Sequence, residues 1–224
     1  KSAQKSEEIL YNSSFYYKYM VMRMKGIASA TAWEIVKFYR QSKFRPAGFE
    51  IRIGENGSIA PVKLTPKNGA AVVNGFIDRA DMAEIDGEKY ISILDYKSSE
   101  KDMNEELADA GIRIQPLIYA KAMCEEMSGT SPAAVLYMKM DDPIVSAENA
   151  LSDEELDSKR HNEIRIKGWV VGSDSVSAAF ESGESADKFL PTSKNAVLDK
   201  EDFLQKIEKA YQKITLSAEE ILAG

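Results

Sequence analysis

The sequence is poor in the residues that usually cross-link small folds or hold metals. It has one cysteine, Cys124, and one histidine, His161, among 224 residues. A single cysteine cannot form a disulfide within the chain or supply the repeated spacing of a zinc finger. The composition therefore excludes a disulfide framework and a zinc-finger module, and it favours a reducing compartment, which we expect to be the cytoplasm.

Long apolar runs and an excess of positive charge are also missing. No stretch approaches the roughly 18 apolar residues of a membrane-spanning helix, so we expect no membrane partner. Lys and Arg number 29 against 36 Asp and Glu, and the formal net charge is −7. This balance argues against a free-standing nucleic-acid-binding domain, because such domains are usually basic. The hydrophobic content of 44% nevertheless permits a sizeable core.

Two apolar runs near the middle of the chain each end in an aspartate. The first run leads to Asp78 and the second to Asp95, and Asp86 and Gly87 lie between them. An Asp-Gly pair between apolar runs is typical of a two-residue hairpin turn. We therefore predict two neighbouring antiparallel strands that bring Asp78 and Asp95 together.

Lys97 follows Asp95 by two residues. Because side chains alternate along a strand, Asp95 and Lys97 point to the same side. Two carboxylates with a lysine beside them suit a hard divalent cation such as Mg²⁺, which takes oxygen ligands and acts on phosphate esters. The alternative is an ordinary solvated strand end, since short motifs of this kind have many false positives.

Helical and strand patterns surround this stretch. Gln115 and Tyr119 share one face of a helix predicted to run to about Met127. Strands are predicted over residues 49–54 and 132–140, and two helices, with their aromatic residues in the core, are predicted before residue 45. The pattern indicates an α/β (α+β) fold with a central mixed sheet flanked by helices.

The last third of the chain carries weaker signals. Residues 153–163 form a helix or loop in which we expect His161 to lie at the surface. A strand is predicted over residues 164–171, and a long irregular segment over residues 172–193. An amphipathic helix is predicted to begin near Leu198.

The central residues resemble the motifs of the PD-(D/E)xK nucleases of the RecB type. The resemblance rests on residues 75–79 (GFIDR), residues 94–98 (LDYKS) and the Q-x-x-x-Y pair Gln115 and Tyr119. The wider chain is most similar to the C-terminal nuclease region of the B subunit of AddAB-type (RexAB-type) bacterial helicase–nucleases. Residues 42–50, 164–171 and 218–224 extend this similarity over nearly the whole chain.

The resemblance implies a restriction-endonuclease-like PD-(D/E)xK core and a metal centre. Asp78 and Asp95 are the expected metal ligands, with the backbone carbonyl of Tyr96 as a third. An acidic residue at the position of Glu50 lies near the metal in this family. The alternative for Glu50 is a solvent-facing side chain paired with Arg52 or a neighbour.

Three further residues have expected roles beside the acid pair. Phosphodiester cleavage needs a nucleophilic water, and Lys97 is expected to orient or deprotonate it and to stabilise phosphate charge. By resemblance, Gln115 and Tyr119 are expected to position the metal-bound water or the scissile phosphate.

The implied activity is that of a Mg²⁺-dependent DNA exonuclease, with Mn²⁺ as a substitute metal. Such a domain is part of a helicase–nuclease that processes double-strand breaks for recombinational repair, and its partners are DNA and the A subunit. We expect one nuclease domain over residues 1–224, with helices in 1–45, the core in 46–140 and a C-terminal part in 141–224.

The chain departs from the family in two respects. RecB-type nucleases usually carry a metal-ligating histidine before the first strand, and no histidine precedes His161. Many B subunits also hold an iron–sulfur cluster, and Cys124 matches none of its cysteine positions. We therefore expect the sequence, which begins at Lys1, to be part of a longer protein that carries these groups. The nuclease activity of the present 224 residues by themselves is expected to be weak or absent.

Two other functions stay open. The first is a non-catalytic scaffold with a nuclease fold that binds a partner subunit or a DNA strand. The second is a stand-alone RecB-like or Cas4-like exonuclease. A scaffold has no chemical need for Asp78, Asp95, Lys97, Gln115 and Tyr119 together, whereas the net charge of −7 favours it mildly.

Overall fold

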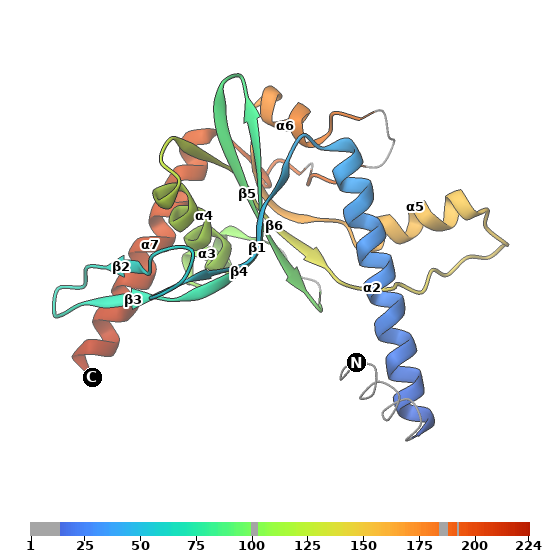
Figure 1. Cartoon of the computed structure of the whole chain (residues 1–224), viewed down its shortest axis with the longest axis horizontal. Helices are drawn as coiled ribbons and strands as arrows, with labels where there is room; N and C mark the ends of the chain where they lie inside the picture. The colour runs from blue at the N-terminus through green and yellow to red at the C-terminus, as the bar shows by residue number, and fades with distance from the viewer. Residues whose placement is uncertain (1–13, 100–102, 184–187, 192) are drawn as a thin grey trace.

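The structure, a computed structural model, describes residues 14–99, 103–183, 188–191 and 193–224. Six strands form one mixed sheet in the order β1-β4-β5-β6-β7-β8, and helices flank it on both faces (Figure 1). The predicted central mixed sheet flanked by helices is therefore confirmed. The elements in chain order are α2 (Phe15–Gln41), β1 (Arg45–Ile53), β2 (Val62–Leu64), β3 (Ala71–Val73), β4 (Gly75–Ile85), β5 (Glu88–Lys97), α3 (Glu105–Asp109), α4 (Gln115–Glu126), β6 (Thr130–Lys139), α5 (Asp153–Glu163), β7 (Lys167–Val171), α6 (Asp174–Phe180), β8 (Val197–Leu198) and α7 (Lys200–Ala223).

The hairpin β4–β5 forms the middle of the sheet. Asp86 and Gly87 connect the two strands, and both have positive φ angles, 53° and 82°. Two-residue hairpin turns of this kind match the right-handed twist of the strands, which explains the Asp-Gly pair. The predicted turn is confirmed, but β4 does not end at Asp78 and continues to Ile85.

Two apolar layers hold the helices onto the sheet. On one face, α4 and α7 pack through residues such as Leu117 and Phe203 onto Ile77 and Ile93. On the other face, α2 and α6 contribute Phe38 and Phe180, which pack with Phe44 and Leu94. Alternating side chains of β4 and β5 therefore enter different layers, and the two faces of this strand pair have different surroundings.

Helix α2 is one continuous helix where the sequence predicted two. Ser14 caps its N-terminus by accepting a hydrogen bond from Tyr17 N at 3.3 Å. Gly26 and the small polar residues after it lower helix propensity but do not stop the helix, because none of them removes a backbone donor. The first thirteen residues, which the helix prediction also covered, lie outside the described residues.

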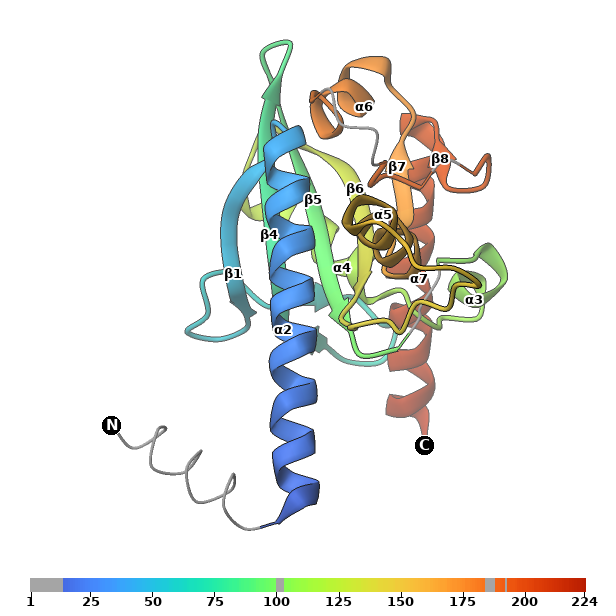
Figure 2. The ribbon, with the colours of Figure 1, turned by 90° about the vertical axis from the view of Figure 1, so that its right-hand side faces the viewer.

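The N-terminal half of α2 extends beyond the sheet in both views (Figures 1 and 2). Its aromatic side chains are therefore not all in the core, and the prediction of core packing is wrong for several of them. The exposed members of this half include Phe15, Tyr16 and Tyr19. In the C-terminal half Phe38 is buried as predicted, whereas Trp33 is exposed and the prediction is wrong for it.

The structure of the C-terminal third differs from three further sequence-based predictions. His161 is buried, because its side chain lies against Glu34 of α2. Strand β7 begins at Lys167, later than predicted, and the segment predicted to be irregular contains α6. The predicted final helix is confirmed as α7, capped by Asp199. Among the described residues, no helix combines the length and apolar character needed to cross a membrane.

Candidate active site

Asp78 and Asp95 lie on adjacent strands of the central hairpin. The β4–β5 register ends at the pair Arg79–Leu94, so Asp78 and Asp95 are the next residues on the two strands, and the Asp78 carboxylate is near enough to raise the pKa of Asp95. Opposed residues on antiparallel strands have Cβ atoms about 4.5–5.5 Å apart and share one face. The Tyr96 backbone N–H donates to Asp78 Oδ2 at 2.8 Å, which holds the Asp78 carboxylate at the end of β5.

Asp95 is a buried carboxylate with a raised pKa. Only 3% of the residue is exposed. Burial is the main cause of the raised pKa, the Lys97 ammonium opposes it, and the Asp78 carboxylate adds to it. Asp95 Oδ2 contacts the Lys97 ammonium as an ion pair, and no other donor among the described residues reaches this buried oxygen. A second cation beside the two carboxylates would therefore relieve their repulsion and give Asp95 Oδ2 a further partner.

The donor set suits a small hard cation. Lys97 O accepts a hydrogen bond from Met140 N on the β6 side. Since the peptide groups of successive residues point to opposite sides of a strand, the Tyr96 carbonyl points to the Asp78 side. Mg²⁺ is usually bound by one or two carboxylates, with waters and substrate phosphate completing the shell. Two carboxylates and one carbonyl fit that requirement.

Glu50 is not gathered into this carboxylate pair. It lies between the register pairs Phe49–Arg79 and Ile51–Ile77, level with Asp78, but its side chain is exposed and its φ is 47°. No group of three or more Asp, Glu, His or Cys side chains converges on a possible metal position in the described part of the chain. A metal role for Glu50 stays a prediction.

Gln115 and Tyr119 meet on one face of α4, as the sequence predicted. Gln115 Nε2 donates to the Tyr119 hydroxyl at 2.6 Å. Both residues and Lys97 line a cleft of about 630 Å³. Gly75 allows this approach, because a Cβ at this position would lie 2.5 Å from the Tyr119 hydroxyl oxygen. The structure thus brings four of the predicted catalytic residues to the same side of the sheet as Asp78.

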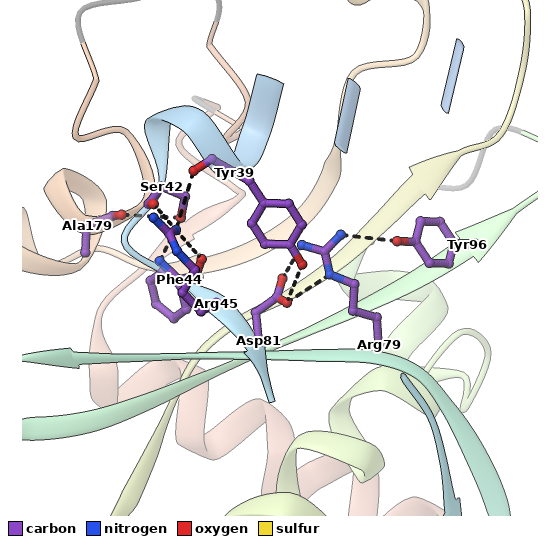
Figure 3. Close-up of polar contacts among 8 residues, drawn as sticks. All are labelled: Tyr39, Ser42, Phe44, Arg45, Arg79, Asp81, Tyr96 and Ala179. Carbon is purple, nitrogen blue, oxygen red and sulfur yellow. Dashed lines mark hydrogen bonds and ion pairs between the residues drawn. The ribbon is translucent and has the colours of Figure 1, made fainter. Parts of the chain in front are cut away.

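The opposite face of the hairpin carries a buried charged cluster that the sequence did not reveal (Figure 3). Arg79 has no exposed surface and donates to both carboxylate oxygens of Asp81, at 2.9 and 2.6 Å. Tyr39 from α2 donates to Asp81 at 3.3 Å, and its ring lies 4.4 Å from the guanidinium. The Arg-x-Asp spacing places both side chains on one face, but only the packing of α2 shows that this face is buried.

Tyr96 links the two faces. Its backbone N–H holds Asp78, whereas its hydroxyl accepts a hydrogen bond from Arg79 Nη1 at 3.2 Å (Figure 3). Tyr96 also lies between Asp95 and Lys97 in sequence. The buried cluster therefore fixes the strand end that carries the candidate site.

The histidine and the cysteine, residue types that often bind metals, lie outside the candidate site. His161 Nδ1 is 2.6 Å from a Glu34 carboxylate oxygen, and Nε2 is 3.1 Å from the Lys188 carbonyl oxygen. Burial raises the pKa of the Cys124 thiol to about 11, which makes it a poor nucleophile and metal ligand at neutral pH. The surroundings of His161 and Cys124 therefore indicate structural roles for both residues.

Comparisons with a family profile and with individual known proteins agree with each other. The sequence profile of the PD-(D/E)XK nuclease superfamily matches residues 1–224. A protein of Caldanaerobacter subterraneus subsp. tengcongensis, named as the B subunit of an ATP-dependent helicase/deoxyribonuclease, is 37% identical over 169 residues, which cover 73% of this chain and 15% of that protein. The protein of the same name from Clostridium acetobutylicum is 31% identical over 230 residues, which cover 96% of this chain and 20% of that protein. The chain spans a fifth or less of the length of these relatives.

Proposed function

The chain belongs to the PD-(D/E)XK nuclease superfamily, and we propose that it is a Mg²⁺-dependent exonuclease domain that hydrolyses DNA phosphodiester bonds. The observation that carries the proposal is the pair of facing carboxylates, Asp78 and Asp95, beside the Lys97 ammonium. Their arrangement provides oxygen ligands and a cation at one strand end, next to the cleft that Lys97, Gln115 and Tyr119 line.

The proposed mechanism assigns a separate task to each side chain. A bound divalent metal would neutralise charge on the phosphate and lower the pKa of a bound water. Asp78, Asp95 and the Tyr96 carbonyl would hold the metal. Lys97 donates to a phosphate oxygen and orients the attacking water, and it stabilises the negative charge that develops during cleavage.

Gln115 and Tyr119 position the reacting groups from the helix side. Their mutual hydrogen bond fixes the Tyr119 hydroxyl in the wall of the cleft. From there they hold the attacking water or the scissile phosphate. Correct placement of reacting atoms contributes strongly to catalysis even where no bond is made to the positioning group.

The names of the relatives support a place in a larger enzyme. We propose that the domain acts in a helicase–nuclease that processes double-strand breaks for recombinational repair, together with DNA and a helicase subunit. Three expectations stay predictions: an iron–sulfur cluster, a single nuclease domain over residues 1–224, and a cytoplasmic location.

A metal titration combined with a cleavage assay tests the proposal. Wild type and Asp95→Ala are titrated with Mn²⁺ by calorimetry, and the same samples are then given single-stranded DNA. Glu84→Ala is a matched control, because Glu84 is an exposed carboxylate on the same strand as Asp78. We expect Mn²⁺ binding in wild type and Glu84→Ala and none in Asp95→Ala, and we expect any cleavage, slow as it is in this part of the protein, only in the two proteins that bind the metal.

Each result has a separate meaning. Metal binding that disappears in Asp95→Ala supports the site even where cleavage by this part of the protein is slow. Equal isotherms for all three proteins would contradict a metal centre at Asp95, and a non-catalytic scaffold would then be the better description.

A further inference from the structure

A second cavity adjoins the candidate active site and is lined by cations. Its volume is about 180 Å³, and Lys97, Lys139 and Lys167 line it together with Arg165. We refer to the three lysines as the cationic row. Lys97 and Tyr137 line both this cavity and the larger cleft, so the two spaces meet at these residues.

The sheet register places the cationic row beside the acid pair. Lys97 of β5 pairs with Lys139 of β6, and Tyr137 of β6 pairs with both Asp95 and Lys167 on its two sides. Paired residues of neighbouring strands share a face, and strands lie about 4.7–4.9 Å apart. The row therefore starts at the candidate active site and crosses three strands on the same face as Asp95.

Carboxylates lie close to parts of the row. Lys97 contacts Asp95, Lys139 Nζ lies 2.9 Å from Asp141 Oδ2, and Glu163 lies in the cavity wall. The row lysines and Arg165 are half-buried. The ion pairs with Asp95 and Asp141 offset part of the repulsion between these like charges on neighbouring strands. The grouping is unexpected in a chain with a net charge of −7.

Tyr137 gives the junction a fixed and uncharged wall. Burial and the nearby Asp95 carboxylate raise its pKa, so the phenol stays protonated at neutral pH. Its hydroxyl donates to the Arg113 carbonyl oxygen at 3.1 Å, and its ring lies 5.8 Å from Lys97 Nζ. An anionic strand that leaves the cleft past Lys97 would pass the uncharged Tyr137 side chain and then reach Lys139 and Lys167.

We propose that the cationic row binds backbone phosphates of single-stranded DNA next to the scissile phosphate, so that the strand crosses the ends of β5, β6 and β7. The direction of this path rests on the proposed function, which puts the scissile phosphate at Asp78 and Asp95. Lysines act on phosphates as point charges, so the contact is independent of base sequence. The row sets the path of the strand and does not take part in bond cleavage, apart from Lys97.

The test measures binding without cleavage. Binding of a mixed-sequence single-stranded oligonucleotide is followed by fluorescence anisotropy in EDTA. The salt concentration is varied between about 50 and 200 mM, a range in which phosphate contacts make the affinity strongly salt-dependent. The variant is Lys139→Gln/Lys167→Gln. The control is Lys121→Gln/Lys206→Gln, which removes the same charge from ion-paired lysines outside the cavity.

We expect the row variant to bind about 10-fold more weakly at the lowest salt. The slope of log affinity against log salt should fall by about 1.4, because each lost phosphate contact in single-stranded DNA contributes about 0.7. The control should keep the wild-type slope, and both variants should keep the wild-type circular dichroism spectrum and melting temperature.

Three outcomes would overturn the row: equal losses in both double variants, an unchanged slope in the row variant, or no measurable binding by wild type. Cleavage in Mn²⁺ is measured separately. If cleavage depends on Asp95 but the salt slope of the row variant is unchanged, the proposed function stands and phosphate binding by the cationic row is contradicted. A reduced slope in a protein whose Mn²⁺ binding does not depend on Asp95 supports phosphate binding by the row and contradicts the proposed metal centre.

Discussion

The two faces of the β4–β5 hairpin carry charged residues in opposite states. On the α2 face, the Arg79 guanidinium, the Asp81 carboxylate and the Tyr39 hydroxyl are joined by hydrogen bonds. On the α4 face, Asp78 and Asp95 face each other, and burial raises the pKa of Asp95 despite Lys97. Residues of the same two strands thus form a fully hydrogen-bonded cluster on one face, whereas on the other face the buried Asp95 Oδ2 has no hydrogen-bond donor among the described residues.

This difference separates stability from function within one structural unit. A satisfied buried ion pair has little need of a ligand, whereas two facing carboxylates favour any divalent cation that can enter. Tyr96 contacts both clusters, through its hydroxyl and its backbone N–H. We infer that the α2 face holds in place a strand end whose other face is electrostatically unfavourable.

The largest expected effect is on the α2 face. Asp81→Asn leaves the fully buried Arg79 without its carboxylate, so we expect the free energy of unfolding to fall by about 3–5 kcal/mol. Urea denaturation measures the change. The double variant Arg79→Met/Asp81→Leu should be less destabilised than Asp81→Asn, because it leaves no buried unpaired charge. A loss below about 1 kcal/mol for Asp81→Asn would contradict the proposed role of the cluster.

Gly75→Ala tests the packing on the α4 face. The new Cβ would lie 2.5 Å from the Tyr119 hydroxyl oxygen, so Tyr119 or β4 must move. We expect a loss of about 1–3 kcal/mol, as is usual for overpacking, and slower cleavage because the Gln115–Tyr119 pair is displaced. Adding Tyr119→Phe removes the closest atom and should restore part of the stability. Additive losses in the double variant would show that the two sites do not interact.

Tyr39→Phe removes a single hydrogen bond from the α2 face. Asp81 keeps its two bonds to Arg79, so the expected loss is about 0.5–1.5 kcal/mol in urea denaturation. Tyr90→Phe is a matched control, because its hydroxyl bonds the exposed Glu88. The control should change stability less than Tyr39→Phe, and the reverse order would argue against a buried network under α2.

The smallest expected effect is a gain in stability from Asp95→Asn in metal-free buffer. The native pKa of Asp95 is raised, so the folded state binds its proton more tightly than the unfolded state does. Wild type therefore loses stability as the pH rises from the ordinary aspartate range through the raised pKa, and this cost persists at neutral pH. The asparagine variant lacks the cost.

Melting temperatures in EDTA between about pH 4 and pH 8 measure this difference. The advantage of Asp95→Asn should grow with pH, although the variant should not cleave DNA. A difference that does not depend on pH would show that Asp95 has no raised pKa in the folded protein.

Local sequence patterns predicted the parts of the site that depend on neighbouring residues. The Asp-Gly turn set the hairpin, alternation put Asp95 and Lys97 on one side, and helical spacing brought Gln115 and Tyr119 together. Each of these relations spans few residues and follows from the geometry of a strand, a turn or a helix.

Relations between distant segments could not be predicted in this way. The burial of His161 depends on the packing of α5 against α2, and the contact joins His161 to Glu34, 127 residues away in sequence. The prediction of a surface position failed because polar neighbours in the sequence say nothing about the helix that covers them. The exposed aromatic residues of α2 were misjudged for the same reason, since periodicity does not show where a helix extends past its sheet.

The amino-acid sequence by itself determined the secondary structure around the site, the identity of its acidic and basic groups, and the resemblance to a nuclease family. Only the tertiary structure decided which of these groups are buried and which meet across the sheet. It showed that Arg79 and Asp81 support Tyr96, and that Lys139 and Lys167 continue from Lys97. The physical reason is that burial and cross-strand neighbours are set by the packing of distant segments, whereas turns and side-chain alternation are set by covalent geometry.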